Sequence, residues 1–303
     1  RDLHAPDGLV TPPQAWRELG AAGPEPLPDA GAALGFQQGA YWFHVPVVNR
    51  AVTQPHWLLF QGCPLSDRLD LYLRYADGRI VHRSGGDHLP FRARSVSYRY
   101  PNFMLQLPVG ERVDVLLRVQ SQSSMQVPLT LYTPSAFIEI SRDAQFGIGL
   151  YYGILIALFF YNLVLWLALR DASYFWYLLH ISAFGLVLLT LNGLGFEYLW
   201  PRSTWLADKS VPLSICLAQV GMQQFARTFL SLKQRWRLGD RVGLGMIAFF
   251  VVLGVAVLQA VPRASLPVAI VTLAPGRFTY WLLKTSRNKG CSTAGALVTL
   301  ADV

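Results

Sequence analysis

Long apolar stretches lie only in the second half of the chain, and short alternating stretches lie in the first half, with the change near Phe146. A helix needs about 20 mostly apolar residues to cross a bilayer. Five segments reach or approach this length: 147–169, 174–194, 211–228, 242–261 and 266–283. The pattern predicts an all-α transmembrane helix bundle over residues 146–285. Helices buried in a large soluble all-α protein are the weaker reading, because Pro, Gly and charged residues gather at the ends of these segments.

The first half shows the period-two alternation of β-strands. Tyr41–Asn49 alternates between apolar and other side chains, and Asp77-Gly78 is a strong hairpin turn between two such runs. About eight short strands without a long helix favour an antiparallel sandwich. The sequence therefore predicts an all-β, jelly-roll-like sandwich over residues 36–140, after a lead-in segment over residues 1–35 that is rich in Gly, Pro and Ala.

Charge divides the chain at the same place. Residues 1–145 contain 13 arginines, no lysine and 13 acidic residues, so they carry no net charge. Residues 146–303 contain 13 Lys and Arg against 5 acidic residues, and they carry the whole net charge of +8. A nucleic-acid-binding protein needs its excess positive charge on a soluble face, so nucleic acid is not an expected partner. Cations between apolar segments instead set their orientation in a lipid bilayer.

The loops between the apolar segments differ in their positive charge. Residues 227–241 hold five cations and one anion, residues 284–289 hold three cations, and the first loop offers Arg170. The alternate loops hold one cation each, Arg202 and Arg263. Cation-rich loops stay in the cytoplasm. The first half is therefore expected outside the cytoplasm.

The two ends of the chain are less regular. Pro267, Pro275 and Arg277 interrupt the fifth apolar segment, so it is the weakest of the five. Residues 286–303 read as the start of a further apolar segment, which predicts a truncated or altered tail. No secretory signal precedes the first half, so we expect a processed form or a fragment.

No catalytic or metal-binding pattern stands out. The histidines of the first half, at positions 44, 56, 82 and 88, lack the spacing of metal ligands, and Cys63 is the only cysteine there. We therefore expect no metal site and no cofactor. The chain as given is not expected to be an enzyme.

Arginines and aromatic residues alternate between His88 and Tyr100. Aromatic faces stack on sugar rings, and arginine donates hydrogen bonds to hydroxyls or pairs with carboxylates. The segment is therefore a candidate binding site for an extracytoplasmic small molecule or glycan. The alternative is an ordinary polar strand whose arginines pair with Asp87 or Asp67. The candidate ligand-binding residues are Phe91, Arg92, Arg94, Tyr98, Arg99 and Tyr100.

Two polar residues lie inside the first two apolar segments, where hydrocarbon penalises them. At a helical rise of 1.5 Å per residue, Asn162 lies about 12 Å deep and His180 about 9 Å deep. In neighbouring antiparallel helices, the two residues would therefore lie at similar depths in the bilayer. We predict an Asn162–His180 hydrogen bond between the helices, or a small network of both residues with Tyr161, which either stabilises helix packing or acts as a switch.

Several motifs resemble one bacterial receptor family. In the first half they are 41–43, 57–59, 69–72, 77–78 and Gly85–Arg94, which is similar to a G-D-x-x-P-F-x-x-R segment. In the second half they are 161–163, 170–174 and 198–201. Over residues 36–260 the chain resembles the seven-transmembrane receptors with diverse intracellular signalling modules, with their type 2 extracellular domain. His44 departs from the Arg or Lys expected there, and the chain shows five spans instead of seven.

The resemblance implies a receptor of the bacterial inner membrane with a periplasmic N-terminal domain. It implies a carbohydrate-like ligand and a homodimer. It also implies a histidine kinase or a diguanylate cyclase as the output module, which this chain does not contain. The first rival is a membrane-anchored carbohydrate-binding protein without signalling. The second rival is an intramembrane enzyme or transporter, which would need paired intramembrane acids, histidines or a Ser–His dyad.

Overall fold

The computed structural model describes residues 2–5, 10–21, 32–36, 39–121 and 124–259. The chain divides into two compact units. The first contains Arg1–Phe146 and Thr190–Asp208, and the second contains Gly147–Leu189 and Lys209–Val303. The predicted fifth apolar segment and the predicted tail lie outside the described residues.

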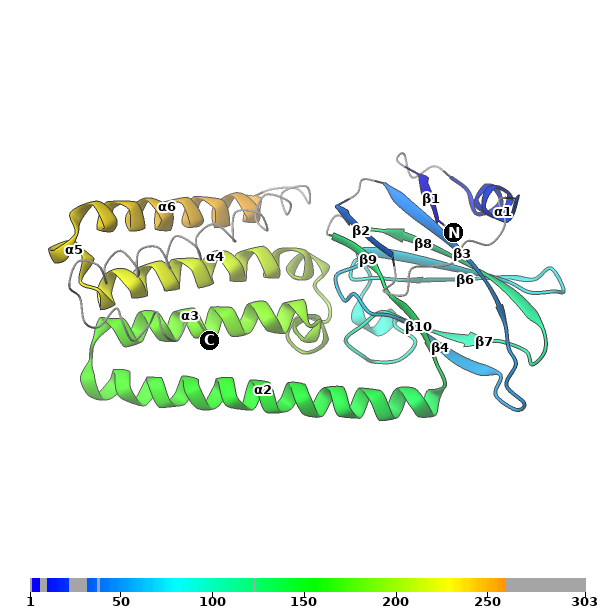
Figure 1. The fold of residues 1–303 in the computed structure, drawn as a ribbon, viewed down its shortest axis with the longest axis horizontal. Coiled ribbons are helices and arrows are strands. Elements are labelled where there is room, and N and C mark those ends of the chain that lie inside the picture. The colour runs from blue at the N-terminus through cyan, green and yellow to red at the C-terminus, as the bar shows by residue number, and fades with distance from the viewer. Residues whose placement is uncertain (1, 6–9, 22–31, 37–38, 122–123, 260–303) are drawn as a thin grey trace. The chain divides into compact units, whose positions relative to one another are not determined.

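Antiparallel sheets form most of the first unit (Figure 1). One sheet has the strand order β1-β3-β8-β5-β6, a second has the order β10-β4-β7, and β2 pairs with β9. The strands are β1 Asp2–Ala5, β2 Ala32–Phe36, β3 Ala40–Val48, β4 His56–Gln61, β5 Arg68–Arg74, β6 Ile80–Gly85, β7 Asn102–Gln106, β8 Arg112–Gln120, β9 Ser124–Val127 and β10 Leu129–Tyr132. A sheet-rich first half followed by helices confirms the predicted fold class.

Alternation along the strands builds the core. Leu69, Leu71 and Leu73 of β5 are fully or almost fully buried, and they pack with Leu105 of β7 and Met125 of β9 in one apolar cluster. All three sheets contribute to this cluster, so they enclose a common core as a sandwich. The intervening side chains of β5 point to the other face of the five-stranded sheet.

A short helix covers part of that other face. α1 Pro12–Ala21 lies beside β1 and β3 (Figure 1) and buries Trp16. Trp42 of β3 is 1% exposed, and both tryptophan rings contact the ring of Tyr72, with centroids 6.3 and 5.9 Å away. Trp42 is therefore a packing residue.

Helices form the second unit and continue into the first. They are α2 Pro134–Leu169, α3 Ala172–Leu191, α4 Thr204–Phe229, the single turn α5 Leu232–Arg235 and α6 Arg237–Gln259. Three of the described helices, α2, α3 and α6, are long and apolar enough to cross a membrane. α4 contains the predicted segment 211–228 and is also continuous, but it is not one of these three.

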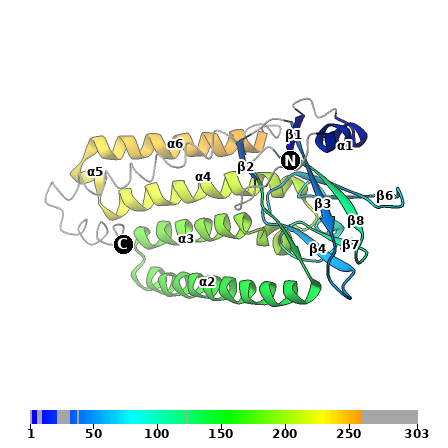
Figure 2. The same ribbon diagram turned by 45° about the vertical axis from the view of Figure 1, so that its right-hand side comes forward.

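The helices of the second unit run side by side, with α3 between α2 and α4 and with α6 next to α4 (Figures 1 and 2). Gly221 of α4 lies so close to α3 that a Cβ atom there would stand 3.0 Å from the His180 backbone. Between α4 and α6, Arg227 Nη2 lies 2.8 Å from Asp240 Oδ1. A small residue and a charge pair thus fix two neighbouring helix contacts.

Candidate functional site

The six predicted ligand-binding residues do not share one exposed surface. Phe91, Tyr98 and Arg99 are buried, with exposures of 7%, 5% and 7%. Arg94 and Tyr100 are half-buried, and Arg92 is exposed. Of the six, only Arg92 is freely open to a ligand in this structure.

One buried asparagine holds the end of this segment. Asn102 Oδ1 accepts a hydrogen bond from the Val96 backbone N–H at 2.8 Å. Its Nδ2 donates to the carbonyls of Val96 and Tyr100 at 2.9 and 3.1 Å. Tyr98 then packs against Leu58. The segment is therefore a fixed part of the sandwich.

We expect Asn102→Ala to loosen this segment without unfolding the sandwich. Three backbone groups lose their partner, at a cost of about 2 kcal/mol. Trypsin, which cleaves after arginine, should then cut the 92–99 region at least about tenfold faster than in the parent chain. Gln106→Ala on the same strand is the control, because the Gln106 side chain is exposed. Equal cleavage rates in both variants would contradict the assigned role of Asn102.

Residues 88–100 pack against residues 193–208, which comprise the connection between α3 and α4 and the start of α4, and we call this contact the junction. The Phe91 ring meets the Phe196 ring edge-on at 5.7 Å, and both belong to a buried cluster with Ala207. The Phe91 backbone N–H donates to the Pro201 carbonyl at 3.2 Å. Gly193 has a positive φ of 77°, and a Cβ atom there would stand 2.6 Å from the Arg99 carbonyl oxygen. The junction is therefore closely packed, and no pattern along the chain predicted it.

Two arginines of the junction keep unused donors. The Arg94 guanidinium lies 4.6 Å from the Phe91 ring centre and 5.4 Å from that of Phe196. Its Nε and Nη2, and the Nε and Nη1 of Arg99, have no hydrogen-bond partner among the described residues. Burial lowers the pKa of Arg94 to about 10. Burial also raises the pKa of Glu197, although the charges of both arginines oppose this shift.

Two carboxylates and an imidazole meet beside the junction. Asp67, Asp87 and His88 each offer one ligand atom, and these atoms all lie within 4.8 Å of one another. Burial, and then the charge of Asp67, raise the pKa of Asp87. A hydrogen bond with Asp208 is the main cause that raises the pKa of His88. These three residues are able to hold a metal ion, although the spacing of the histidines along the sequence gave no sign of it.

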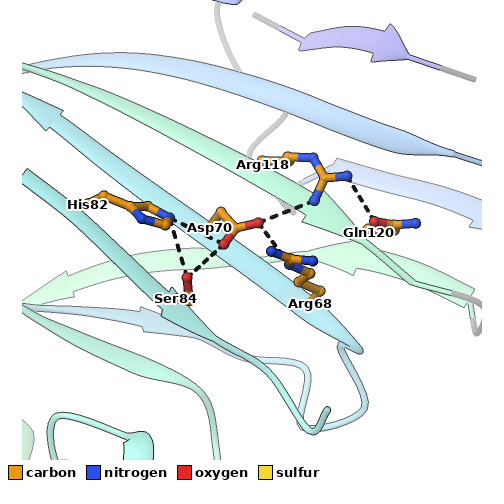
Figure 3. A network of polar contacts seen from close by, with 6 residues as sticks. All are labelled: Arg68, Asp70, His82, Ser84, Arg118 and Gln120. Carbon is orange, nitrogen blue, oxygen red and sulfur yellow. Dashed lines mark hydrogen bonds and ion pairs between the residues drawn. The ribbon is translucent and has the colours of Figure 1, made fainter. Parts of the chain in front are cut away.

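A polar network occupies the face of the five-stranded sheet away from the sandwich core (Figure 3). Asp70 accepts hydrogen bonds from Ser84 at 2.8 Å, Arg68 at 3.1 Å and Arg118 at 3.2 Å. His82 Nε2 lies 3.3 Å from the same carboxylate. The side chains of Arg68 and His82 are 59% and 46% exposed, while that of Asp70 is 3% exposed. The buried Asp70 carboxylate therefore holds Arg68 and His82, and the polar groups of these two side chains are exposed to solvent.

Sequence reasoning missed this network, although a signal for it existed. Residues 68, 70 and 72 alternate with the buried leucines of β5, so their place on the opposite face follows from the pattern. The register Asp70↔Ser84 and Asp70↔Arg118 then brings three strands together. Only the strand pairing supplies this second step.

The predicted hydrogen bond between Asn162 and His180 does not form in the structure. Asn162 is half-buried, and its Nδ2 donates to the Leu158 carbonyl of its own helix at 2.8 Å. His180 Nδ1 instead lies 2.9 Å from the Ala218 carbonyl oxygen of α4. His180 therefore links α3 to α4, and Asn162 satisfies itself locally.

Comparison with known proteins identifies the family to which the chain belongs. A search of curated proteins found no match. The family model described as 7TMR-DISM extracellular 2 matches residues 3–133, and the model described as 7TM diverse intracellular signalling matches residues 144–290. The two matches follow the sheet-rich and the helical parts of the chain and confirm the resemblance of the motifs. The chain therefore belongs to the 7TMR-DISM family of membrane receptors involved in signalling, with the type 2 extracellular domain in its first half.

Proposed function

We propose that this chain is the input part of a receptor that senses an extracytoplasmic ligand with its sandwich and relays binding through the junction. The observation that carries this proposal is the close packing of residues 88–100 on residues 193–208. The latter segment is covalently continuous with both α3 and α4. A displacement of the sandwich segment therefore has a direct mechanical route to two helices.

The proposal places the first unit in the periplasm of a bacterial cell and the helices in its inner membrane. The support is the charge of the loops. The end of α4, α5 and the start of α6 together carry Arg227, Lys233, Arg235, Arg237 and Arg241, whereas the connection from α3 to α4 carries Arg202. The richer loop belongs in the cytoplasm. The output that fits this orientation is a cytoplasmic histidine kinase or diguanylate cyclase, and such modules work as dimers.

A glycan or another polyhydroxylated small molecule is the ligand class that we propose. The polar network of Figure 3 supports it, because the exposed side chains of Arg68 and His82 offer fixed polar groups, and the exposed His82 ring lies flat on Tyr72 with ring centres 4.4 Å apart. Sugars bind to protein surfaces that combine an aromatic face with fixed polar groups. Arg92, the exposed member of the predicted binding segment, is the second place for such a contact.

The network also leads directly to the junction. β5 begins with Arg68, immediately after Asp67, and β6 ends at Gly85, just before Asp87. The chain then continues from Asp87 through His88 to Phe91 within a few residues. A ligand that draws Arg68 and His82 together therefore acts on strands that end at the junction.

The test is a chimera in which this chain replaces the sensor and membrane regions of a family member with a measurable cyclase output. A glycan library is applied to cells that carry the chimera, and cyclase product is measured. We expect at least one glycan to change the output. Phe91→Ala and Phe196→Ala should bind that glycan with unchanged affinity but reduce the change in output by at least about fivefold, since a coupling free energy of 1 kcal/mol or more is lost.

The variants distinguish the parts of the proposal. His82→Ala should lower glycan affinity and leave the coupling per bound ligand unchanged, and Arg79→Ala on the nearby hairpin, which is exposed, is the matched control. Glycan binding without any change in output would show a binding module instead of a receptor. No response to any glycan, with a folded chimera, would overturn the ligand class.

A further inference from the structure

Asp67, Asp87 and His88 form a compact group that the sheet-face network does not use. Asp67 precedes β5, and Asp87 and His88 follow β6. Their ligand atoms lie within 4.8 Å of one another. Ligand atoms around one small divalent cation lie up to about 4 Å apart, because each bond is about 2 Å long. Side-chain movements of less than about 1 Å would therefore close this group around an ion.

Of the three residues, Asp87 gives the strongest reason to expect a bound cation. Its side chain belongs to a residue that is 5% exposed, and its Oδ1 has no hydrogen-bond partner within the described part of the chain. A buried carboxylate is costly unless it is paired, protonated or bound to a metal. Asp67 increases this cost, because it places a second carboxylate beside the first. A divalent cation would satisfy the free oxygen and offset the repulsion at once.

The backbone holds the three side chains in place. The N–H of Asp87 donates to the Ser66 carbonyl at 3.0 Å, and the N–H of His88 donates to the Asp67 carbonyl at 3.1 Å. Gly86 makes this approach possible, because a Cβ atom there would stand 2.3 Å from the Asp67 carbonyl oxygen. Ser121 Oγ donates to Asp67 Oδ1 at 3.2 Å and orients that carboxylate. The three side chains are therefore held in place by two hydrogen-bonded segments, residues 66–67 and residues 86–88.

A fourth side chain orients the imidazole. His88 Nε2 lies 3.3 Å from Oδ1 of Asp208, a residue near the start of α4. Proteins commonly place a carboxylate on one nitrogen of a metal-binding histidine, which fixes the ring and makes it a stronger ligand. An imidazole with two carboxylates suits Zn²⁺ and its transition-metal neighbours, whereas Ca²⁺ and Mg²⁺ prefer oxygen ligands alone.

We propose that Asp67, Asp87 and His88 bind a divalent transition-metal ion, with Zn²⁺ as the best match, and that Asp208 positions His88 for it. The ion would tie the start of β5 to the segment after β6 and, through His88 and Asp208, to the start of α4. The inference rests on the geometry of the first unit, and it stands whether or not the ligand of the receptor is a glycan.

The experiment measures Zn²⁺ binding to the purified full chain in detergent after chelation and removal of the chelator. Calorimetric titration should give one site per chain. Asp87→Asn and His88→Gln should each weaken binding at least about tenfold, and Asp208→Asn should weaken it about tenfold, the usual effect of losing a partner of a metal ligand. Ca²⁺ at the same concentration should not displace Zn²⁺.

His82→Ala is the matched control, because His82 also pairs with an aspartate, Asp70, at 3.3 Å but belongs to no group of three possible metal ligands among the described residues. Its Zn²⁺ affinity should equal that of the parent. The thermal unfolding curve of each variant, recorded without metal, establishes that it is folded. If Asp87→Asn does not fold, His88→Gln still tests the proposal. The His88 side chain is 39% exposed, so its replacement is expected to leave the fold intact.

Three results would overturn the proposal. They are a folded parent chain that binds no Zn²⁺, equal affinity in the parent and in folded His88→Gln, and loss of the site in His82→Ala. Displacement of Zn²⁺ by equimolar Ca²⁺ would reject the transition-metal assignment, because it would show a site governed by the carboxylates.

Discussion

Replacing Gly86 with alanine is expected to lower the stability of the first unit by about 3–4 kcal/mol. Gly86 has a φ of 118°, which costs an L-residue about 1–2 kcal/mol. The new Cβ atom would also stand 2.3 Å from the Asp67 carbonyl oxygen and 2.9 Å from that of Ser66, and both are backbone atoms that cannot rotate away. The two backbone hydrogen bonds from Asp87 and His88 must then break, at about 1 kcal/mol each.

Thermal unfolding of the full chain in one detergent, followed by tryptophan fluorescence, measures this loss. For a unit of this size the apparent melting temperature should fall by about 6–15 °C. Gly78→Ala is the control, because Gly78 also has a positive φ, 83°, but nothing lies within 4 Å of its Cβ position. Equal decreases in melting temperature in the two variants would mean that the close approach of residues 66–67 to residues 86–88 does not contribute to the loss of stability.

Removing the carboxylate in Asp70→Ala is expected to cost about 3 kcal/mol. The Asp70 side chain is 3% exposed, and Arg118, which is 13% exposed, donates to it at 3.2 Å. Deleting one partner of a buried ion pair leaves the other charge uncompensated, and that penalty dominates the effect. Ser84 Oγ loses its acceptor as well. The melting temperature should fall by about 6–12 °C.

Asp114→Ala tests whether burial is the cause. Asp114 also pairs with two arginines, Arg74 and Arg112, but their side chains are 42% and 63% exposed. Solvent-exposed pairs contribute about 1 kcal/mol or less. A loss in Asp114→Ala as large as in Asp70→Ala would contradict the argument from burial.

Acid provides an independent measurement on the same network. Burial alone raises the pKa of Asp70, but hydrogen bonds from Ser84 and His82 and the charges of Arg68 and Arg118 together lower it below its ordinary value. Because the folded-state pKa is the lower one, the stabilisation is present above the unfolded-state pKa and is lost as the pH falls through the folded-state pKa. The stability difference between the parent and Asp70→Asn should therefore shrink below about pH 4. A difference that stays constant down to pH 2 would refute the assigned shift.

The sequence predicted the strands well because side chains alternate along a strand with a period of two. The leucines of β5 and the valines of β8 fall on the core face, and the charged residues between them fall on the other face. The apolar segments were equally clear, since length and composition alone decide whether a helix is able to cross a bilayer. α2, α3 and α6 cover three of the predicted segments.

The candidate site was only partly predictable. The segment from His88 to Tyr100 was predicted to bind a ligand with exposed aromatic rings, but Phe91 and Tyr98 are buried and Tyr100 is half-buried. Phe91 meets Phe196, a residue more than one hundred positions further along the chain. No local pattern reports such a contact, because the composition of a strand or loop is the same whether its aromatic rings face a ligand or another segment of the protein.

The sequence by itself determined the division into a sheet-rich half and a helical half, the membrane character of the helices and the family, because these follow from periodicity, hydropathy and short motifs. Only the tertiary structure decided which polar groups meet. The hairpin of β5 and β6 brings Asp67 to Asp87, and the start of α4 brings Asp208 to His88. The rise of a helix fixed the depths of Asn162 and His180, but the direction of each side chain around its helix depends on packing, and packing gave them different partners.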